Sequence, residues 1–484
     1  MAEQSLKDKT VKGVIWSSVE RMAGQLVQFF VMIVLARLLT PHDYGLIGMI
    51  AIFIALSQSL IDSGFSQALI RKKECTEEDY STVFYFNIVV STFVFILFYF
   101  VAPLVQSFYE EPELAVVMRL LCVSIIINAF SIVPKAIFTI RLNFKIQSIS
   151  SIVAALVSGL IGIGMALNGG GVWSLVAQQL AYAFFSTLIL WIYSKWSPKL
   201  VFSKESFVEM FSFGSKLMAV GVINTIFTNL YTIVIGKIYA STTLGFYTRG
   251  QHFAELPAIN ITSIVQRVSY PVMCKMQDDK IQFTSFFVRV LKMTAYCFFP
   301  LMAIIAGVSI PVVEIVLGSK WTYCGVLMIP LCFAMMWYPF HALNLNILEV
   351  VGKSDLFLKL EIVKKTITVI VLVTSIPLGV EALCYSQVFT SILFIFINAW
   401  YTKSYLYLSF IEQLKLYLPS FLTSLLIFAF IFVIGKALGN VYLWFIEGIV
   451  LGPGLYYLLS RFIGFSQIGE LKILLAGTAL NRRS

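Results

Sequence analysis

Long apolar runs recur along the whole chain and restrict it to one class of fold. Each run is about as long as the roughly 20 residues that an α-helix needs to cross a bilayer. Of the 484 residues, 59% are hydrophobic and only 12% are charged, whereas about a quarter of the residues are charged in soluble domains. This chain has too little charge to cover a water-facing surface of its size. We therefore predict an all-α polytopic membrane protein.

The charged and turn-forming breaks between the apolar runs predict about 14 transmembrane helices. The opening residues are polar and basic and lack a cleavage site, so the first apolar run is expected to remain as a membrane helix. The approximate bounds of the predicted helices are 14–39, 44–66, 82–105, 114–137, 147–167, 172–194, 212–238, 244–270, 286–309, 322–348, 357–378, 380–402, 412–436 and 441–463.

The basic residues predict how the chain is oriented. Most of the 35 Lys and Arg residues fall in every second connection, beginning with the N-terminal segment. Lys and Arg are enriched in cytoplasmic loops. We therefore expect both termini in the cytoplasm and a multi-pass protein of the bacterial cytoplasmic (inner) membrane. The same distribution accounts for the net charge of +10 without a nucleic-acid partner.

The chain contains a weak internal sequence repeat. The pattern ARLL followed by YGL at 36–46 returns as GKIY followed by LGF at 236–246, and two further matches recur at an offset of 208. We predict two six-helix bundles around a central cavity, at 1–200 and 201–407. Residues 408–484 are expected to add two transmembrane helices and a cytoplasmic tail. Parallel repeats of this kind bind the solute between the halves and rock them alternately.

Motifs of catalysis and of cofactor binding are missing. The seven cysteines are scattered and form no CxxC pair, so we expect neither a metal site nor a disulfide framework. Gly352-Lys353-Ser354 ends like a phosphate-binding loop, but Ile347 stands where its first glycine is required. We predict no cofactor and no enzymatic activity.

The first predicted helix carries a polar stripe. Arg21, Gln25 and Gln28 follow helical spacing, and an ionisable residue deep in a span usually faces protein or water. One interpretation is that the stripe lines a water-filled cavity and binds the solute. The alternative is polar contact between packed helices, with Glu20 as a local counter-ion to Arg21.

Repeat-related positions carry polar or cationic residues as well. The 200-residue offset places Asn224 and Thr228 on the equivalent face of helix 212–238. It also relates Arg37 to Lys237, near the outer ends of their helices. These two cations are expected either to anchor the helix ends by extending toward the interface or to guide an anionic headgroup.

A second group of candidates lies on helix 244–270. Arg249, His252 and Glu255 follow one another at intervals of three residues, so neighbours can meet on one face. They predict either a satisfied buried ion pair or a solute-binding cation with titratable partners. Asp62, within the second predicted helix, is another candidate for a proton or counter-ion role.

The connection between the two predicted halves, 195–211, is the longest on the inner side. Its apolar residues allow a short amphipathic helix on the membrane surface, and a plain tether is the alternative. The residues that would form the apolar face are Phe202, Phe207, Met210 and Phe211.

Two segments resemble a known family. LARLLTPHDYGLIGM at 35–49 and YTRGQHFAELPAINITSIVQRVSYPVM at 247–273 are similar to Wzx-type flippases, in the polysaccharide-transporter branch of the multidrug/oligosaccharidyl-lipid/polysaccharide exporter superfamily. The colanic-acid and teichuronic-acid exporters look most similar. The resemblance implies alternating-access transport of an undecaprenyl-diphosphate-linked oligosaccharide from the cytoplasmic to the outer leaflet.

The resemblance also implies site residues and partners. Arginines on spans one, two and eight engage the diphosphate in related flippases, and Arg21 and Arg249 match spans one and eight. Span two offers only Asp62, so that contact is in doubt. The expected partners are the lipid-linked oligosaccharide, membrane lipids, and a polysaccharide polymerase with its assembly proteins. Glu255 or Asp62 would couple return of the empty carrier to protons.

Two other functions remain open on the sequence. A multidrug exporter of the same superfamily would favour acidic residues in its cavity, whereas Arg21 and Arg249 are cationic. A membrane-embedded glycan polymerase would need a large outer loop, and the predicted outer loops are short.

Overall fold

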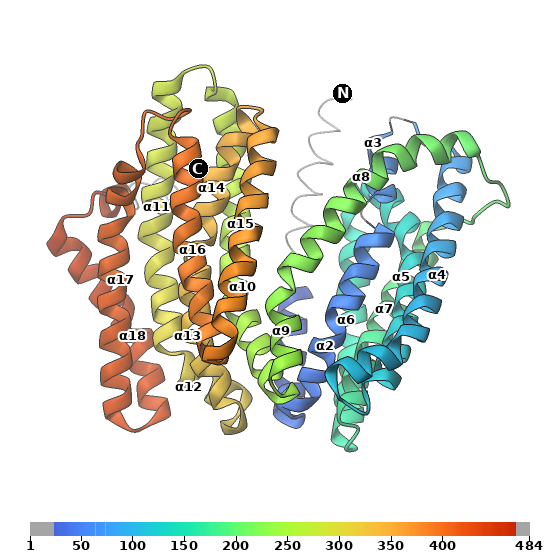
Figure 1. Cartoon of the computed structure of the whole chain (residues 1–484), viewed down its shortest axis with the longest axis horizontal. Helices are drawn as coiled ribbons and strands as arrows, with labels where there is room; N and C mark the ends of the chain where they lie inside the picture. The colour runs from blue at the N-terminus through green and yellow to red at the C-terminus, as the bar shows by residue number, and fades with distance from the viewer. Residues whose placement is uncertain (1–23, 63, 73, 471–484) are drawn as a thin grey trace, which may run out of the picture. The chain divides into compact units, whose positions relative to one another are not determined.

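Helices make up all the regular secondary structure of the part of the chain that the computed structural model describes, residues 24–62, 64–72 and 74–470. The chain forms two compact units, Met1–Gly245 and Phe246–Ser484 (Figure 1). This confirms the all-helical class. The three predicted segments 1–200, 201–407 and 408–484 stay a prediction.

The first unit is built on helix pairs that follow one another in the chain. α4 packs along α5, and α6 packs along α7. Thr76 and Asp79 form a capping box that starts α4, and such a box satisfies two free backbone amides. The helices are the segment Gly24–Leu38, α2 (Pro41–Asp62), α3 (Phe65–Arg71), α4 (Glu77–Tyr109), α5 (Leu114–Ile140), α6 (Phe144–Leu167), α7 (Val172–Ser194), α8 (Lys204–Thr228), α9 (Leu230–Ile238) and the first turn of α10 (Ser241–Met276).

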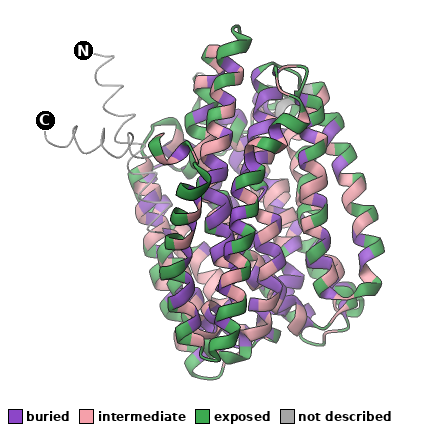
Figure 2. Cartoon of the chain, turned by 90° about the vertical axis from the view of Figure 1, so that its left-hand side faces the viewer, coloured by how far each residue is buried: buried purple, intermediate pink, exposed green. Residues whose placement is uncertain are grey.

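The second unit contains the rest of α10 and the remaining helices. Buried residues gather on the faces that helices turn toward each other (Figure 2). These helices are α11 (Lys280–Gly307), α12 (Ser309–Leu317), η1 (Ser319–Trp321), α13 (Thr322–Met335), α14 (Tyr338–Val350), α15 (Ser354–Ser375), η2 (Ile376–Leu378), α16 (Val380–Thr402), α17 (Phe410–Leu438) and α18 (Val441–Ile463).

The last two helices pack on α11. Trp444 of α18 donates its indole N–H to the carbonyl oxygen of Gly307 at 3.1 Å. A Cβ on Gly452 would lie 3.0 Å from a methyl of Ile431 on α17. Because small residues allow helices to approach closely in a membrane, these glycines let α18 fit against α11 and α17.

Ten helices of the described residues are long and apolar enough to cross a membrane, or up to eleven if a bent helix is included. This confirms a multi-pass membrane protein, whereas the count of 14 stays a prediction. The bent helix is α8, whose two parts Lys204–Ser212 and Gly214–Thr228 meet at 43°. α10 and α15 are also long enough, but they are less apolar than these helices.

The internal sequence repeat has a counterpart in the structure. The helix that precedes α2 ends at Leu38, and α9 ends at Ile238; α2 and α10 begin three residues later, at Pro41 and Ser241. The first turns of α2 and α10 then touch, and His42 Nδ1 lies 2.6 Å from the Ser241 hydroxyl. The correspondence supports the repeat over these segments, and two six-helix bundles stay a prediction.

This contact brings backbone against backbone. A Cβ on Gly45 would overlap the Ser241 carbonyl oxygen, and a Cβ on Gly245 would overlap the Pro41 carbonyl oxygen. We call the four residues Pro41, Gly45, Ser241 and Gly245 the glycine crossing. All four belong to the first unit.

Candidate functional site

Three predicted site residues cannot be placed. Arg21 and Glu20 lie outside the described residues, and so does the side chain of Asp62. Their roles stay predictions.

The polar stripe of the first unit lies toward its surface. Gln25 is half-buried and Gln28 is exposed. On α8, Asn224 and Thr228 are exposed, and the Thr228 hydroxyl donates to the Asn224 carbonyl oxygen at 2.9 Å. A dry contact between helices would bury such polar groups, and the lining of a water-filled cavity stays a prediction.

The two repeat-related cations are both exposed, Arg37 before α2 and Lys237 on α9. Lys237 pairs with Glu110 at 2.9 Å and lies 5.2 Å from the centre of the Phe108 ring. The hydrogen bond from Lys237 lowers the pKa of Glu110 below its usual range. Lys237 therefore fastens α9 to the end of α4, and both the interfacial anchor and the headgroup contact stay predictions.

The candidates of the second unit follow one helix, α10. Arg249 is half-buried, His252 is exposed and Glu255 is half-buried. Gln251 donates its amide to Glu255 Oε1 at 2.6 Å. Sequence reasoning did not select Gln251, although its spacing of four residues from Glu255 is the interval at which helical neighbours meet.

Other helices of the second unit fix the rotation of α10. The Gln266 amide of α10 donates to Asn346 Oδ1 on α14 at 3.1 Å. The Gln387 amide of α16 donates to the Tyr247 hydroxyl at 3.2 Å. Tyr247, Ala254 and Ala258 are buried, so one face of α10 packs inward and the opposite face stays accessible.

Buried polar contacts join α14 to α16, a buried ion pair lies within α15, and sequence reasoning missed both. The Thr402 hydroxyl donates to Asn344 Oδ1 at 3.0 Å, and Asn398 Nδ2 lies 3.3 Å from His341 Nδ1. On α15, buried Lys364 pairs with Glu361. Polar residues inside a membrane bundle join helices or mark transport pathways. Glu361 and Lys364 are three residues apart within predicted helix 357–378, and sequence reasoning could have used this spacing to predict the ion pair.

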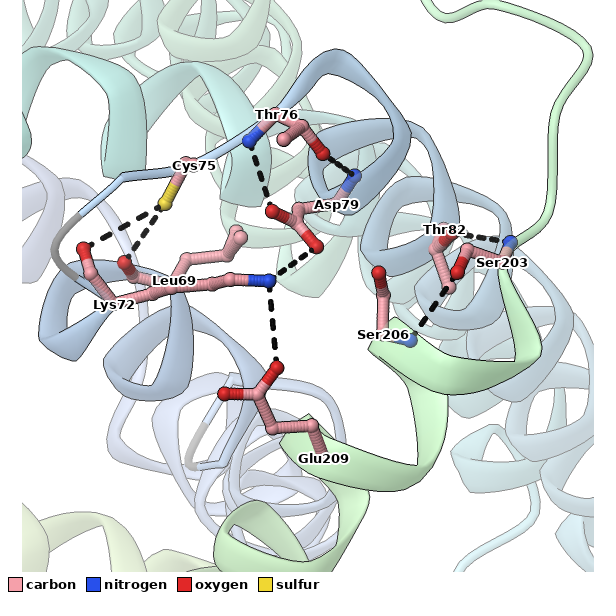
Figure 3. A network of polar contacts seen from close by, with 9 residues as sticks. All are labelled: Leu69, Lys72, Cys75, Thr76, Asp79, Thr82, Ser203, Ser206 and Glu209. Carbon is pink, nitrogen blue, oxygen red and sulfur yellow. Dashed lines mark hydrogen bonds and ion pairs between the residues drawn. The ribbon is translucent and has the colours of Figure 1, made fainter.

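A second missed network lies in the first unit, where α3, α4 and α8 meet (Figure 3). The Lys72 ammonium lies 2.8 Å from Asp79 Oδ1 and 3.3 Å from Glu209 Oε2. The Asp79 side chain is fully buried, with 0% exposed, whereas 62% of the Glu209 side chain is exposed. The hydrogen bond to Asp79 raises the pKa of Lys72 above its ordinary value. We call these three residues the lysine bridge.

The bridge fastens the connection between the predicted halves. Around it, the Ser203 amide donates to the Thr82 hydroxyl at 3.0 Å, as drawn in Figure 3. The connection becomes helical at Lys204, so a plain tether is excluded for its second part. Phe207 and Met210 pack into the core of the first unit, whereas Phe202 and Phe211 stay exposed and available to lipid.

Comparison with known proteins identifies relatives of the chain. Residues 34–325 match the model of a family described as "Polysaccharide biosynthesis protein". The chain is 25% identical to the teichuronic acid biosynthesis protein TuaB of Bacillus subtilis (strain 168), over 66% of either chain. It is 26% identical to the lipopolysaccharide biosynthesis protein WzxC of Escherichia coli (strain K12), over 66% of this chain and 65% of that one. The chain thus matches about two thirds of these relatives.

Solved structures of low sequence identity show the same fold. The lipid II flippase MurJ, in an inward closed conformation, has a TM-score of 0.69 at 16% identity, over 94% of this chain and 98% of that one. An inward-facing multidrug resistance MATE family transporter has a TM-score of 0.62 at 13% identity, over 81% and 98%. These neighbours show that the chain shares the fold of membrane transport proteins.

Proposed function

The chain belongs to the polysaccharide biosynthesis protein family, and we propose that it is a flippase for an undecaprenyl-diphosphate-linked oligosaccharide. The solute moves from the cytoplasmic to the outer leaflet by alternating access. The protein lies in the bacterial cytoplasmic membrane with both termini in the cytoplasm, where it works with a polysaccharide polymerase and assembly proteins. The names of its relatives, which concern teichuronic acid and lipopolysaccharide, support a lipid-linked glycan as the substrate.

The observation that carries the proposal is the position of Arg249. It is a half-buried cation on a long helix of a membrane protein, and a charged residue within a span usually faces protein or a water-filled cavity rather than lipid. A guanidinium binds a phosphate through two parallel hydrogen bonds. Arg249 is therefore suited to the diphosphate, and Arg21 is proposed as its counterpart in the first unit.

The remaining candidates are proposed to have supporting roles. Gln25, Gln28, Asn224 and Thr228 would offer polar contacts to a hydrated sugar chain. The membrane potential, negative inside, favours outward movement of an anion by about 2.3 kcal/mol per charge per 100 mV. Glu255, with His252 beside it, or Asp62 would bind a proton. Proton binding would thereby be coupled to the return of the empty carrier.

Complementation tests the assignment of the two arginines. In a strain whose own copy of the gene is deleted, Arg21→Ala and Arg249→Ala are expected to lower surface polysaccharide roughly tenfold, because a hydrogen bond to a charged group is lost. Expression is matched by immunoblot. Arg119→Ala is the control, because Arg119 is a half-buried cation that is already bonded to the Tyr99 carbonyl oxygen at 3.2 Å. Full polysaccharide in both arginine variants would show that the assignment is wrong.

A multidrug exporter is the second candidate, favoured by the likeness to the MATE family transporter. The two functions differ in the charge that they require, since organic cations need an acidic cavity. Efflux of ethidium from cells that express the protein distinguishes them. Efflux that persists in Arg249→Ala and stops in Glu255→Gln would favour the exporter.

A further inference from the structure

A second arginine follows Arg249 on α10 at a defined interval. Arg267 comes eighteen residues later, and an α-helix has 3.6 residues per turn. Five full turns therefore separate the two residues, which places them on the same line along the helix. At 1.5 Å per residue they lie about 27 Å apart. α10 continues as one helix through this interval, from Ser241 to Met276.

The line lies on the accessible side of α10. Between the two arginines it passes Leu256 and Asn260, which are half-buried, and Arg267 itself is exposed. The opposite side of the helix carries buried Ala258 and Thr262. No hydrogen bond or ion pair of Arg267 is found among the described residues, so its guanidinium is available to a ligand.

The spacing suits the ends of a path across the membrane. Both arginines lie nine residues from Ala258, the middle of α10. Their separation of about 27 Å is close to the thickness of the hydrocarbon core, which is about 30 Å. The distribution of basic residues predicts that the Arg267 end is cytoplasmic. An anionic headgroup that starts in the cytoplasmic leaflet would meet this end first.

We propose that Arg267 captures the diphosphate headgroup at the cytoplasmic end of α10, before the headgroup reaches Arg249. This inference rests on the proposed flippase function and names an additional substrate-binding residue. The competing role is an interfacial anchor, in which an arginine extends to ordinary phospholipid headgroups. Lysine performs that role equally well, whereas paired hydrogen bonds to a phosphate require the planar fork of arginine.

Binding of a defined probe tests the proposal. The full chain is placed in phosphatidylcholine nanodiscs, and the Kd of geranylgeranyl diphosphate is measured by native mass spectrometry. We expect Arg267→Ala and Arg267→Lys to raise the Kd about tenfold, because the charge-assisted bonds are lost or weakened. Lys275→Ala is the matched control, since Lys275 is an exposed cation on α10 that lies about 80° from the line. Its Kd should equal that of the natural protein.

The outcomes separate the inference from the function on which it rests. If the natural protein binds the probe, Arg249→Ala weakens it and Arg267→Ala does not, the capture role is wrong and the proposed function stands. An unchanged Kd in Arg267→Lys would identify an interfacial anchor, as would equal competition by phosphatidylglycerol. No binding by the natural protein would overturn the proposed function itself.

Discussion

Replacing Gly45 with alanine is expected to destabilise the first unit by about 2–3 kcal/mol, the upper part of the range for overpacking. The added methyl would overlap the Ser241 carbonyl oxygen. A backbone carbonyl cannot change rotamer as a flexible side chain can. The first turns of α2 and α10 would therefore have to separate. The His42–Ser241 hydrogen bond of 2.6 Å would be lost with them. The melting temperature of the detergent-purified protein measures the effect.

Gly164→Ala is the matched control. Gly164 lies on α6, and a Cβ there would meet nothing within 4 Å. Since alanine is a better helix former than glycine, this variant should be as stable as the natural protein or slightly more stable. Equal melting temperatures for Gly45→Ala and Gly164→Ala would show that the glycine crossing is not closely packed. Gly245→Ala should behave as Gly45→Ala does, because a Cβ there would overlap the Pro41 carbonyl oxygen.

The glycine crossing shows what can be predicted from sequence and what cannot. The repeat between 36–46 and 236–246 was visible because both copies retain a glycine at the same place. The pattern therefore predicted two related segments. It did not predict that these segments contact each other, because a sequence pattern does not indicate which helices pack together. That contact depends on the close backbone approach of the two first turns at Gly45 and Gly245.

The two arginines of α10 also differ in how far the sequence alone reveals them. Arg249 was found because a charge within a predicted span is costly and therefore conspicuous. Arg267 was not selected, although predicted helix 244–270 already contains both arginines at this interval. The buried face of α10 was needed to show which side stays accessible.

The lysine bridge is the part that sequence reasoning missed most completely. Lys72 directly follows α3 and Glu209 lies on α8, far apart in the chain. Asp79 was one of several acids near the start of a predicted helix, which is the usual place for a capping carboxylate. Only the fold brings the cation to that carboxylate and removes water from it. Burial, rather than residue type, sets the importance of this contact.

Replacing Lys72 with methionine is therefore expected to destabilise the protein by about 2–3 kcal/mol. Removal of one partner from a buried ion pair typically costs 3–5 kcal/mol, and we expect less here because 26% of the Lys72 side chain is exposed. The raised pKa of Lys72 determines the pH dependence. Because the pKa of Lys72 is higher in the folded protein, the ion pair stabilises the fold fully at pH values below the ordinary pKa of 10.5. This stabilisation is lost as pH rises through the higher pKa of the folded protein. The melting-temperature difference should stay constant from pH 6 to 9.

A double-mutant cycle isolates the pair. If Lys72 acts by neutralising Asp79, Lys72→Met should cost less in an Asp79→Asn background than alone, because the buried charge is already gone. Glu209→Gln should have a small effect, since 62% of its side chain is exposed and exposed pairs contribute little. Lys204→Met is the matched control, an exposed cation at the start of α8. If Lys72→Met were no more costly than Lys204→Met, the Asp79 carboxylate would be satisfied by the Thr76 amide at 2.8 Å alone, and the lysine bridge would not stabilise the fold.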